Sequence, residues 1–159
     1  MIDLIRKLKS EDKNEYIRMA KDFYNSPAVL SSVPDANFET TFNELMTSDV
    51  YTEAFIFEVN QKTAGYGLIA KTFSQEAGGI VVWIEEIYVK AKFRNQGLGS
   101  EFIEYVKTNI SARRYRLETE PDNIKAQNLY KRHGFHNLKY INFSLDDNNA
   151  TQTYKESSL

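Results

Sequence analysis

The sequence predicts a single α/β domain with a mixed, mostly antiparallel sheet flanked by helices. Three apolar stretches, at residues 51–59, 63–73 and 80–89, follow one another with only short turns between them. This spacing is typical of an antiparallel meander. The third stretch leads through a glycine-containing turn and an amphipathic helix into a further strand. Because such crossover connections join parallel strands, we expect the last strand to run parallel to residues 80–89.

The residues before the meander predict one strand and two helices. Residues 2–8 alternate in polarity as a strand does, and Ser10 is expected to cap a helix that ends before Pro27. A loop with apolar residues leads to Pro34, after which a second helix begins. The apolar residues at helical spacing are Tyr16, Met19, Ala20 and Phe23 in the first helix, and Phe38, Phe42, Leu45 and Met46 in the second.

The residues after the meander predict two helices and two strands. An amphipathic helix runs from Leu98 to about residue 110, and a strand follows at residues 113–118. A short helix comes next, and residues 137–145 are expected to return as a final strand. We therefore expect the folded domain to cover residues 1–145 and a polar C-terminal tail to cover residues 146–159.

Composition excludes several classes of protein. A length of 159 residues with 42% hydrophobic and 13% aromatic content suits one packed domain. A net charge of −2 makes nucleic acid an unexpected partner. The lack of cysteine excludes disulfides, cysteine zinc sites and thiol catalysis, and the two histidines lack acidic ligands at motif spacing, so no metal site is expected. No apolar run is long enough to span a membrane or to act as a signal peptide, and we expect a cytoplasmic protein.

The turn after residue 89 has features of a phosphate-binding loop. It reads Arg94-Asn95-Gln96-Gly97-Leu98-Gly99-Ser100 and opens the helix that begins near Leu98. Glycines let a ligand approach the backbone, and the first turn of a helix presents free N–H groups to an anion. Arg94 can add a charged contact to a phosphate oxygen. A Walker A loop would need Lys after Gly99, and a dinucleotide loop would need glycine at position 102, so neither motif fits.

A second segment reads as a short helix with clear ends. Asn123 or Asp122 can cap its start, and Gly134 suits the left-handed position after its last turn, with Phe135 as the following hydrophobic contact. Ala126, Leu129, Tyr130 and His133 share one face of this helix. Packing alone would account for Tyr130 on such a face.

Together, the two segments resemble the GNAT superfamily of acetyl-CoA-dependent N-acetyltransferases. Arg94-x-x-Gly97-x-Gly99 matches its pyrophosphate loop, and Asn123-x-x-Ala126-x-x-Leu129-Tyr130-x-x-x-Gly134-Phe135 matches its second motif. The resemblance covers roughly residues 2–145 and is closest to small-molecule and polyamine-type members; it implies a sheet that is split at the cofactor cleft. It implies acetyl-CoA as cosubstrate, bound by Ile87, Val89, Arg94, Asn95, Gln96, Gly97, Leu98, Gly99, Ser100, Asn123 and Tyr130.

Acetyl transfer to an amine needs a group that takes a proton from nitrogen and one that gives a proton to the departing sulfur. The resemblance assigns the acid to Tyr130. Glu85 and Glu86 are candidates for the base or for binding a cationic acceptor, and strand alternation is expected to send them to opposite faces. The resemblance favours Glu85, while the alternative is that the strand bulges or opens near its end and exposes both carboxylates to water. Glu118 and Glu120 could extend an acidic pocket or be solvated.

The sequence thus predicts an N-acetyltransferase that acts on a primary amine of a small molecule. Direct attack in a ternary complex is expected, because no cysteine can carry an acyl group. A protein or peptide N-acetyltransferase and a non-catalytic CoA-binding regulatory module are the alternatives. The acceptor wall is expected from residues 25–34 and the first two helices, with Phe23, Tyr24, Leu30 and Phe38 as candidates. The oligomeric state is left open, with a homodimer as one expectation.

Overall fold

A five-stranded sheet with the order β1-β3-β4-β5-β6 forms the middle layer of the computed structural model, which describes residues 1–147 and 153–154. The first four strands in this order are antiparallel neighbours, and β6 runs parallel to β5. The mixed, mostly antiparallel sheet is therefore confirmed, as is the parallel crossover. The strands are β1 (Leu4–Lys7), β3 (Thr52–Val59), β4 (Lys62–Ser74), β5 (Gly79–Val89) and β6 (Arg114–Leu117).

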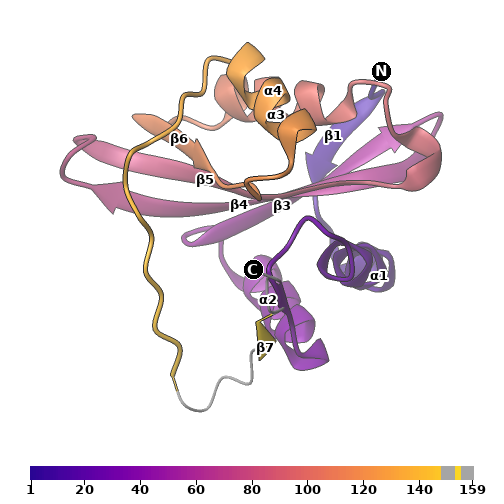
Figure 1. Cartoon of the computed structure of the whole chain (residues 1–159). Coiled ribbons are helices and arrows are strands. Elements are labelled where there is room, and N and C mark those ends of the chain that lie inside the picture. Colours follow the sequence, from indigo (N-terminus) through magenta and orange to yellow (C-terminus); the bar gives the residue numbers. More distant parts are fainter. Residues whose placement is uncertain (148–152, 155–159) are drawn as a thin grey trace.

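Helices cover both faces of this sheet (Figure 1). α1 (Lys13–Tyr24) and α2 (Asp35–Thr47) lie on one face, whereas α3 (Leu98–Asn109) and α4 (Ile124–Arg132) lie on the other. Each of these helices lies where the sequence predicts one. Single 3₁₀ turns precede α1 and α3, at Ser10–Asp12 and Ala91–Phe93. A second, two-stranded sheet pairs β2 (Ser31–Ser32) with β7 (Thr153–Tyr154).

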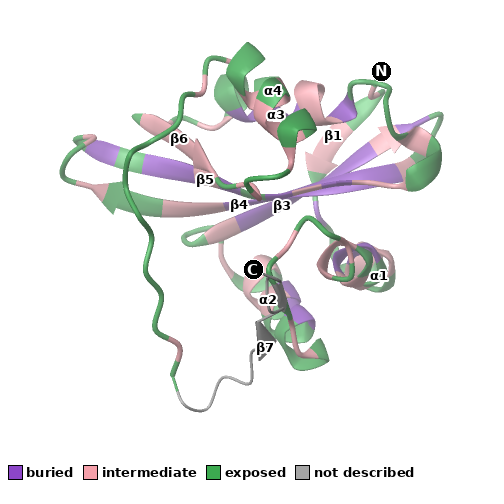
Figure 2. Cartoon of the chain, in the orientation of Figure 1, coloured by how far each residue is buried: buried purple, intermediate pink, exposed green. Residues whose placement is uncertain are grey.

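The alternation of side chains along the central strands creates two cores. In β3, Ala54 and Ile56 pack with α1 and α2, while Phe55 and Phe57 pack with α3. Figure 2 shows the resulting buried band along the middle of the sheet. Because both faces are covered, these strands are almost continuously apolar, as a sheet buried on both sides requires.

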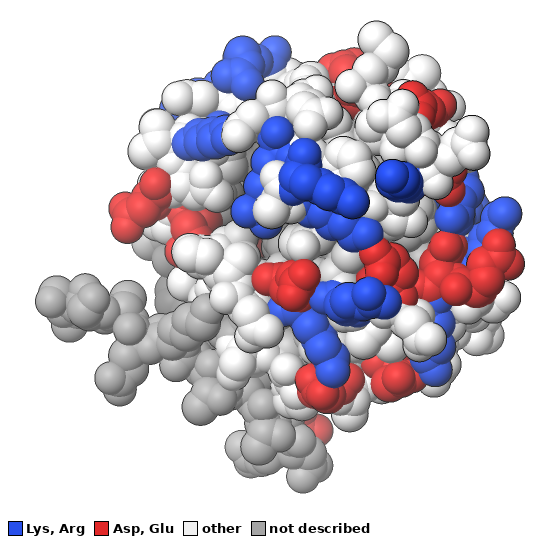
Figure 3. Space-filling view, turned by 90° about the vertical axis from the view of Figure 1, so that its right-hand side faces the viewer, with Lys and Arg blue, Asp and Glu red and all other residues white. Residues whose placement is uncertain are grey.

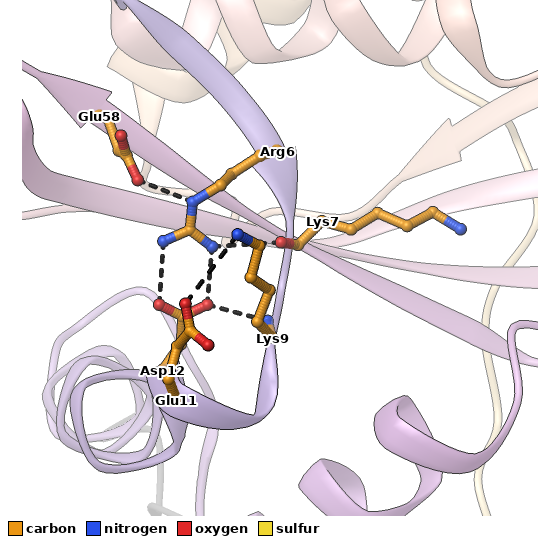
Figure 4. Close-up of polar contacts among 6 residues, drawn as sticks. All are labelled: Arg6, Lys7, Lys9, Glu11, Asp12 and Glu58. Atoms are coloured by element: carbon orange, nitrogen blue, oxygen red, sulfur yellow. Dashed lines mark hydrogen bonds and ion pairs between the residues drawn. The ribbon is translucent and has the colours of Figure 1, made fainter.

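The first strand is tied to the first helix by one arginine. The Arg6 guanidinium donates to both oxygens of Asp12, at 2.7 and 2.9 Å, and through Nε to Glu58 on β3 at 2.7 Å (Figure 4). Asp12 also accepts the backbone N–H of Lys9 at 2.8 Å. The predicted capping role of Ser10 is wrong, because the chain forms a 3₁₀ turn there and the helix starts three residues later, at Lys13.

The predicted final strand at residues 137–145 is also wrong. This segment follows α4 without regular secondary structure. It passes the sheet from the face covered by α3 and α4 toward the face covered by α1 and α2 (Figure 1). Its alternating apolar residues resemble a strand, but a strand forms only where its backbone meets a partner edge. The apolar side chains left exposed are Leu138, Tyr140, Ile141, Phe143 and Leu145. Most of the predicted polar tail, residues 148–152 and 155–159, lies outside the described residues.

Candidate active site

A β-bulge in β5 determines where the two predicted acids lie. Leu68 of β4 pairs with Glu86, but the next residue, Ile69, pairs with Ile84, which leaves Glu85 as the extra residue. A bulge shifts the alternation of a strand by one position. Accordingly Ile84 and Ile87 both belong to the α3 side of the sheet, whereas Glu86 contacts the α1 side. The expectation that Glu85 and Glu86 alternate across a regular strand is therefore wrong in its premise.

The bulge also marks the end of the pairing between β5 and β6. The parallel register runs from Val81 to Ile84 on β5 and from Arg114 to Leu117 on β6, and stops there. Beyond it, residues 85–89 continue β5 along β4 without a described partner on the other side. The sheet is thus split at Glu85, as the fold class predicts. Partly buried apolar side chains from β5, β6 and α4 that pack on the α3 core are Ile87, Val89, Leu117, Leu129 and Tyr130.

The glycine turn leads from β5 into α3 and has the backbone geometry of an anion-binding loop. Gly97 is the N-cap of α3 and has a left-handed φ of 86°. The first intrahelical hydrogen bond is donated by Glu101 to Gly97 O at 3.0 Å. The N–H groups of Leu98, Gly99 and Ser100 precede it in the first turn, where a helix offers no carbonyl partner. A Cβ at Gly97 would meet no atom within 4 Å, so the space in front of this turn is open.

The side chains of the loop are held by contacts within the protein. Arg94 Nε donates to the carbonyl of Val89 at 2.9 Å, and Gln96 Nε2 donates to that of Lys92 at 3.3 Å. Lys125 of α4 donates to the side-chain oxygen of Asn95, which has a φ of 62°. These bonds fix the loop against β5 and α4.

Cations also flank the loop on its other side. A shallow hollow of about 300 Å³ lies beside it, lined by Val59, Asn60, Lys62, Lys92, Phe93 and Gln96. Figure 3 shows that Lys and Arg gather in one region of this side of the molecule and are bordered by Asp and Glu. Lys62, Lys92 and Lys125 were not predicted as site residues, because isolated lysines on turns and helices carry no pattern in the sequence.

The short helix α4 has the ends that the sequence predicts. The Asn123 side chain caps it by accepting the N–H of Ala126 at 3.1 Å. Gly134 has a φ of 87°, and Phe135 N–H donates to Tyr130 O at 3.1 Å, which completes a Schellman-type end. Asn123, predicted to bind cofactor, therefore uses its side-chain oxygen as a helix cap.

Tyr130 is half-buried on α4 and packs edge-on against Phe135, with ring centroids 6.3 Å apart. Burial raises the pKa of Tyr130 above its ordinary value. Within the described part of the chain its hydroxyl has no hydrogen-bond partner. The hydroxyl of Tyr130 is therefore protonated at neutral pH and uncommitted within the described residues.

Glu86 is a buried carboxylate held by two tyrosines. Its side chain is 6% exposed, and its two oxygens accept hydrogen bonds from Tyr24 at 2.7 Å and from Tyr66 at 2.5 Å. Burial raises the pKa of Glu86, and the two hydroxyl donors oppose that rise. From the sequence, Tyr24 is predicted only as a candidate wall residue, and Tyr66 is not predicted at all. These partners lie 62 and 20 residues from Glu86, so no local pattern connects them.

Glu85, in contrast, is solvent-exposed. Although this residue reaches solvent, the surrounding protein removes part of the hydration of its carboxylate, which is the first cause of its raised pKa; the nearby carboxylates of Glu86 and Glu118 are the second. Glu118 follows β6 directly and accepts from Asn142 at 3.0 Å. The three carboxylates therefore gather where β5 and β6 part, while Glu120 lies further along the chain after β6. Repulsion among like charges makes this place attractive to a cation.

Ser100 lies in the first turn of α3, and its hydroxyl is 2.6 Å from Nε2 of His133 at the end of α4. The sequence predicts Ser100 as a cofactor contact but assigns only packing and helix-end charge to His133.

Within residues 1–147 and 153–154, no group of three His, Cys, Asp or Glu side chains is arranged to hold a metal ion. In the same part of the chain, no helix is both long and apolar enough to cross a bilayer.

Comparison with known proteins shows the family. The model of the acetyltransferase (GNAT) family matches residues 14–135, which is most of the chain. The chain therefore belongs to the GNAT family of acetyltransferases. The loop at residues 94–100 and the helix that carries Tyr130 both lie within the matched region.

Curated relatives match part of the chain. Thialysine N-epsilon-acetyltransferase of Mus musculus is 39% identical over 70 residues, which cover 42% of this chain and 41% of that protein. The same enzyme of Sus scrofa is 36% identical over 77 residues, covering 46% of this chain and 45% of that protein. The aligned region thus spans less than half the length of each of these two relatives.

Solved structures match nearly the whole chain. A possible acetyltransferase from Clostridium difficile 630 has a TM-score of 0.78 and 16% identity, covering 92% of this chain and 99% of that one. The aminoglycoside acetyltransferase AAC(6')-Iy, solved with a bisubstrate analogue of CoA and acetylneamine, has a TM-score of 0.74 and 20% identity. It covers 91% of this chain and 97% of its own. At such identities the likeness shows the fold.

Proposed function

We propose that this chain transfers the acetyl group of acetyl-CoA to a primary amine of a small molecule, by direct attack in a ternary complex. One observation carries the proposal. The free first turn of α3 follows β5 after a short connection, and its Gly99 lies beside Ile87, on the part of β5 that continues beyond the pairing with β6. An anion-binding helix end and an apolar opening between two strands are what a long, pyrophosphate-containing thioester requires.

The coenzyme site fits the residues that surround it. The N–H groups of Leu98, Gly99 and Ser100 are available for the pyrophosphate, and the open space at Gly97 allows its close approach. Arg94 and the lysines at 62, 92 and 125 supply positive charge around the loop. Ile87 and Val89 offer an apolar wall, and a strand edge that has no partner among the described residues, for the pantetheine arm.

The proposed reaction exchanges one bond for another. Acetyl-CoA supplies an activated thioester carbonyl, which the neutral amine of the acceptor attacks. The C–N bond forms, the C–S bond breaks, the amine loses a proton, and the thiolate gains one. We assign the donation toward sulfur to Tyr130, because its uncommitted hydroxyl stays protonated at neutral pH and its ring packs on the same core as Ile87 and Val89 of β5.

The two adjacent acids receive different roles in this proposal. Glu85 is exposed and has a raised pKa, so it can take up a proton from the amine or attract its cationic form. Glu86 has both oxygens engaged by tyrosine hydroxyls, so we assign it to positioning Tyr24 and Tyr66 beside the acceptor. This preference for Glu85 agrees with the one drawn from the sequence.

A cationic small-molecule amine is the acceptor class that the acidic opening supports best. The relatives named above act on thialysine, and one structural neighbour was solved with an acetylneamine conjugate. Each of those ligands carries amino groups. The carboxylates of Glu85 and Glu118 at the split in the sheet would concentrate such amines near the thioester.

A panel assay tests the proposal. Thialysine, lysine, polyamines, neamine and lysine-containing or N-terminally free peptides are incubated with acetyl-CoA, and released CoA thiol is measured with a disulfide reagent. The protein contributes no background because it has no cysteine. Turnover of a small amine with a higher kcat/KM than any peptide supports the proposal. Preference for peptides would favour a protein acetyltransferase, and CoA binding without any turnover would favour a regulatory module.

A homodimer and a cytoplasmic location stay predictions of the sequence.

A further inference from the structure

Three polar side chains form a hydrogen-bonded chain beside the proposed pyrophosphate site. Ser100 Oγ lies 2.6 Å from His133 Nε2, and His133 Nδ1 lies 2.6 Å from a carboxylate oxygen of Glu104. Ser100 and Glu104 are four residues apart on α3 and therefore share one face of that helix. His133 ends α4 and reaches both, with its side chain only 11% exposed.

The partners of His133 decide which of its nitrogens carries a proton. Glu104 is ionised at neutral pH, because Lys107 first and His133 second hold its pKa below the usual range. An ionised carboxylate can only accept, so His133 Nδ1 must carry the hydrogen. In neutral His133, Nε2 is then an acceptor, and the hydroxyl hydrogen of Ser100 points to it. When His133 is protonated, Nε2 donates to Ser100 instead.

This choice matters for an anion bound at the first turn of α3. Phosphate oxygens only accept hydrogen bonds, so Ser100 can join the three N–H groups of that turn only if its hydroxyl hydrogen is free. Neutral His133 accepts the hydroxyl hydrogen of Ser100 through Nε2, so this hydrogen is not available to the phosphate. Protonated His133 releases this hydrogen and adds a positive charge beside Ser100.

We propose that His133 and Glu104 are positioning residues for the coenzyme, and that CoA binding takes up a proton on His133. The inference rests on the proposed function, since it requires a pyrophosphate at residues 97–100. By linkage, CoA affinity is highest at low pH and falls as the pH rises through the titration of His133, by at most tenfold per pH unit. Glu104 and Lys107 from α3 contact His133, and Lys131 and Arg132 precede it in the last turn of α4.

Calorimetry with two ligands tests the proposal. CoA and dephospho-CoA are titrated into the whole protein between pH 5.5 and 8.5, in buffers of different ionisation enthalpy. Dephospho-CoA lacks the phosphomonoester that itself titrates near pH 6. We expect the binding of dephospho-CoA to take up close to one proton per site at pH values between the histidine pKa of the free protein and that of the complex. The affinity should weaken as the pH rises.

Two variants separate positioning from packing. Ser100→Ala should lose the proton uptake and should bind with the weaker, pH-independent affinity of the wild type at high pH. Glu104→Gln should also lose the uptake but should keep tight binding at high pH. The amide can donate to Nδ1, so neutral His133 can carry its hydrogen on Nε2 and still release the Ser100 hydroxyl. A merely structural role for Glu104 would weaken binding at every pH.

The matched control is His136→Asn, which removes the only other histidine and should leave the uptake unchanged. The two histidine resonances of the wild type, followed by NMR with and without dephospho-CoA, repeat the test without any variant. The resonance of His133 should shift its titration to higher pH on binding. Binding with no proton uptake, or uptake that persists in Ser100→Ala, overturns the relay alone. Absence of CoA binding at all pH values overturns the proposed function itself.

Discussion

Tyr66 donates its hydroxyl hydrogen to the buried carboxylate of Glu86 across 2.5 Å, directly beside the bulge that splits the sheet. Both side chains are almost fully buried, at 0% and 6% exposure. Tyr24 of α1 donates to the other carboxylate oxygen, so this pair joins the sheet to the helical layer that is expected to hold the acceptor.

Tyr66→Phe should destabilise the protein by about 1–3 kcal/mol, because it leaves one oxygen of a buried carboxylate without its donor. Tyr24→Phe is the matched variant and should cost less, since Tyr24 is half-buried and water can replace its hydroxyl. Urea denaturation at pH 7 measures both. Equal costs would mean that water already reaches Glu86 and that the tyrosine pair does not enclose it.

Glu86 should make the protein less stable as the pH rises. Burial raises its pKa in the folded protein above the unfolded value near 4.3, so between these two values the folded state binds more protons. Its stabilising contribution is complete below the unfolded pKa and is lost as the pH rises through the folded one. The free energy of unfolding of the wild type relative to Glu86→Gln should therefore fall from pH 4 to pH 7. A difference that stays constant with pH would contradict the raised pKa.

Charge, not size, at position 99 should decide coenzyme binding. A Cβ at Gly99 would lie 3.7 Å from Ile87 and Leu129, an ordinary contact, so Gly99→Ala should keep both fold and CoA affinity. Gly99→Asp should abolish the CoA-dependent rise in melting temperature, because it brings a negative charge into the turn that is proposed to bind the pyrophosphate. Gly99→Asn, of equal size but uncharged, should bind at an intermediate level. If Asp and Asn behave alike, the loop does not meet an anion at this point.

Gly97→Ala should act on the fold itself. The left-handed φ of 86° costs a residue with a Cβ about 1–2 kcal/mol, although the added methyl meets no neighbour. Urea denaturation measures the loss, and Gly99→Ala is its control. A stability equal to that of the control would show that the turn relaxes to another conformation.

Tyr130→Phe should lower kcat by ~10²-fold while leaving CoA affinity and melting temperature nearly unchanged. The ring keeps its contact with Phe135, and the hydroxyl has no partner to lose within the described part of the chain. Steady-state kinetics on the best amine of the panel, together with calorimetry of CoA, provide the measurement. A normal kcat in a variant whose chemical step is rate-limiting would reduce Tyr130 to a packing residue.

Glu85→Gln and Glu86→Gln should differ in their pH–rate profiles. If Glu85 takes the amine proton, Glu85→Gln lowers kcat/KM most below the pKa of the amine, and higher pH partly restores it. If Glu85 only attracts a cation, KM rises and kcat stays near that of the wild type. Glu86→Gln should have the smaller effect on either constant at neutral pH. Small and equal effects of both changes would leave the proton to solvent.

The order of elements and the phosphate-binding turn are predictable from the sequence because their signals are local. Gly97 precedes the helix it caps, Asn123 caps the next helix within three residues, and Gly134 ends it. The meander and the crossover follow from apolar periodicity and short connections. The same local reasoning failed at residues 137–145, where a strand-like pattern lacks an edge to pair with.

The sequence by itself thus determined the elements, their order and the family motifs that they carry. Only the tertiary structure decided where the acids face. The bulge at Glu85 depends on pairing with β4, and the partners of Glu86 come from α1 and β4. The contact between Ser100 and His133 joins residues 33 apart in the chain. Such relationships arise when separate elements pack together, and no pattern within one segment encodes the distance between two others.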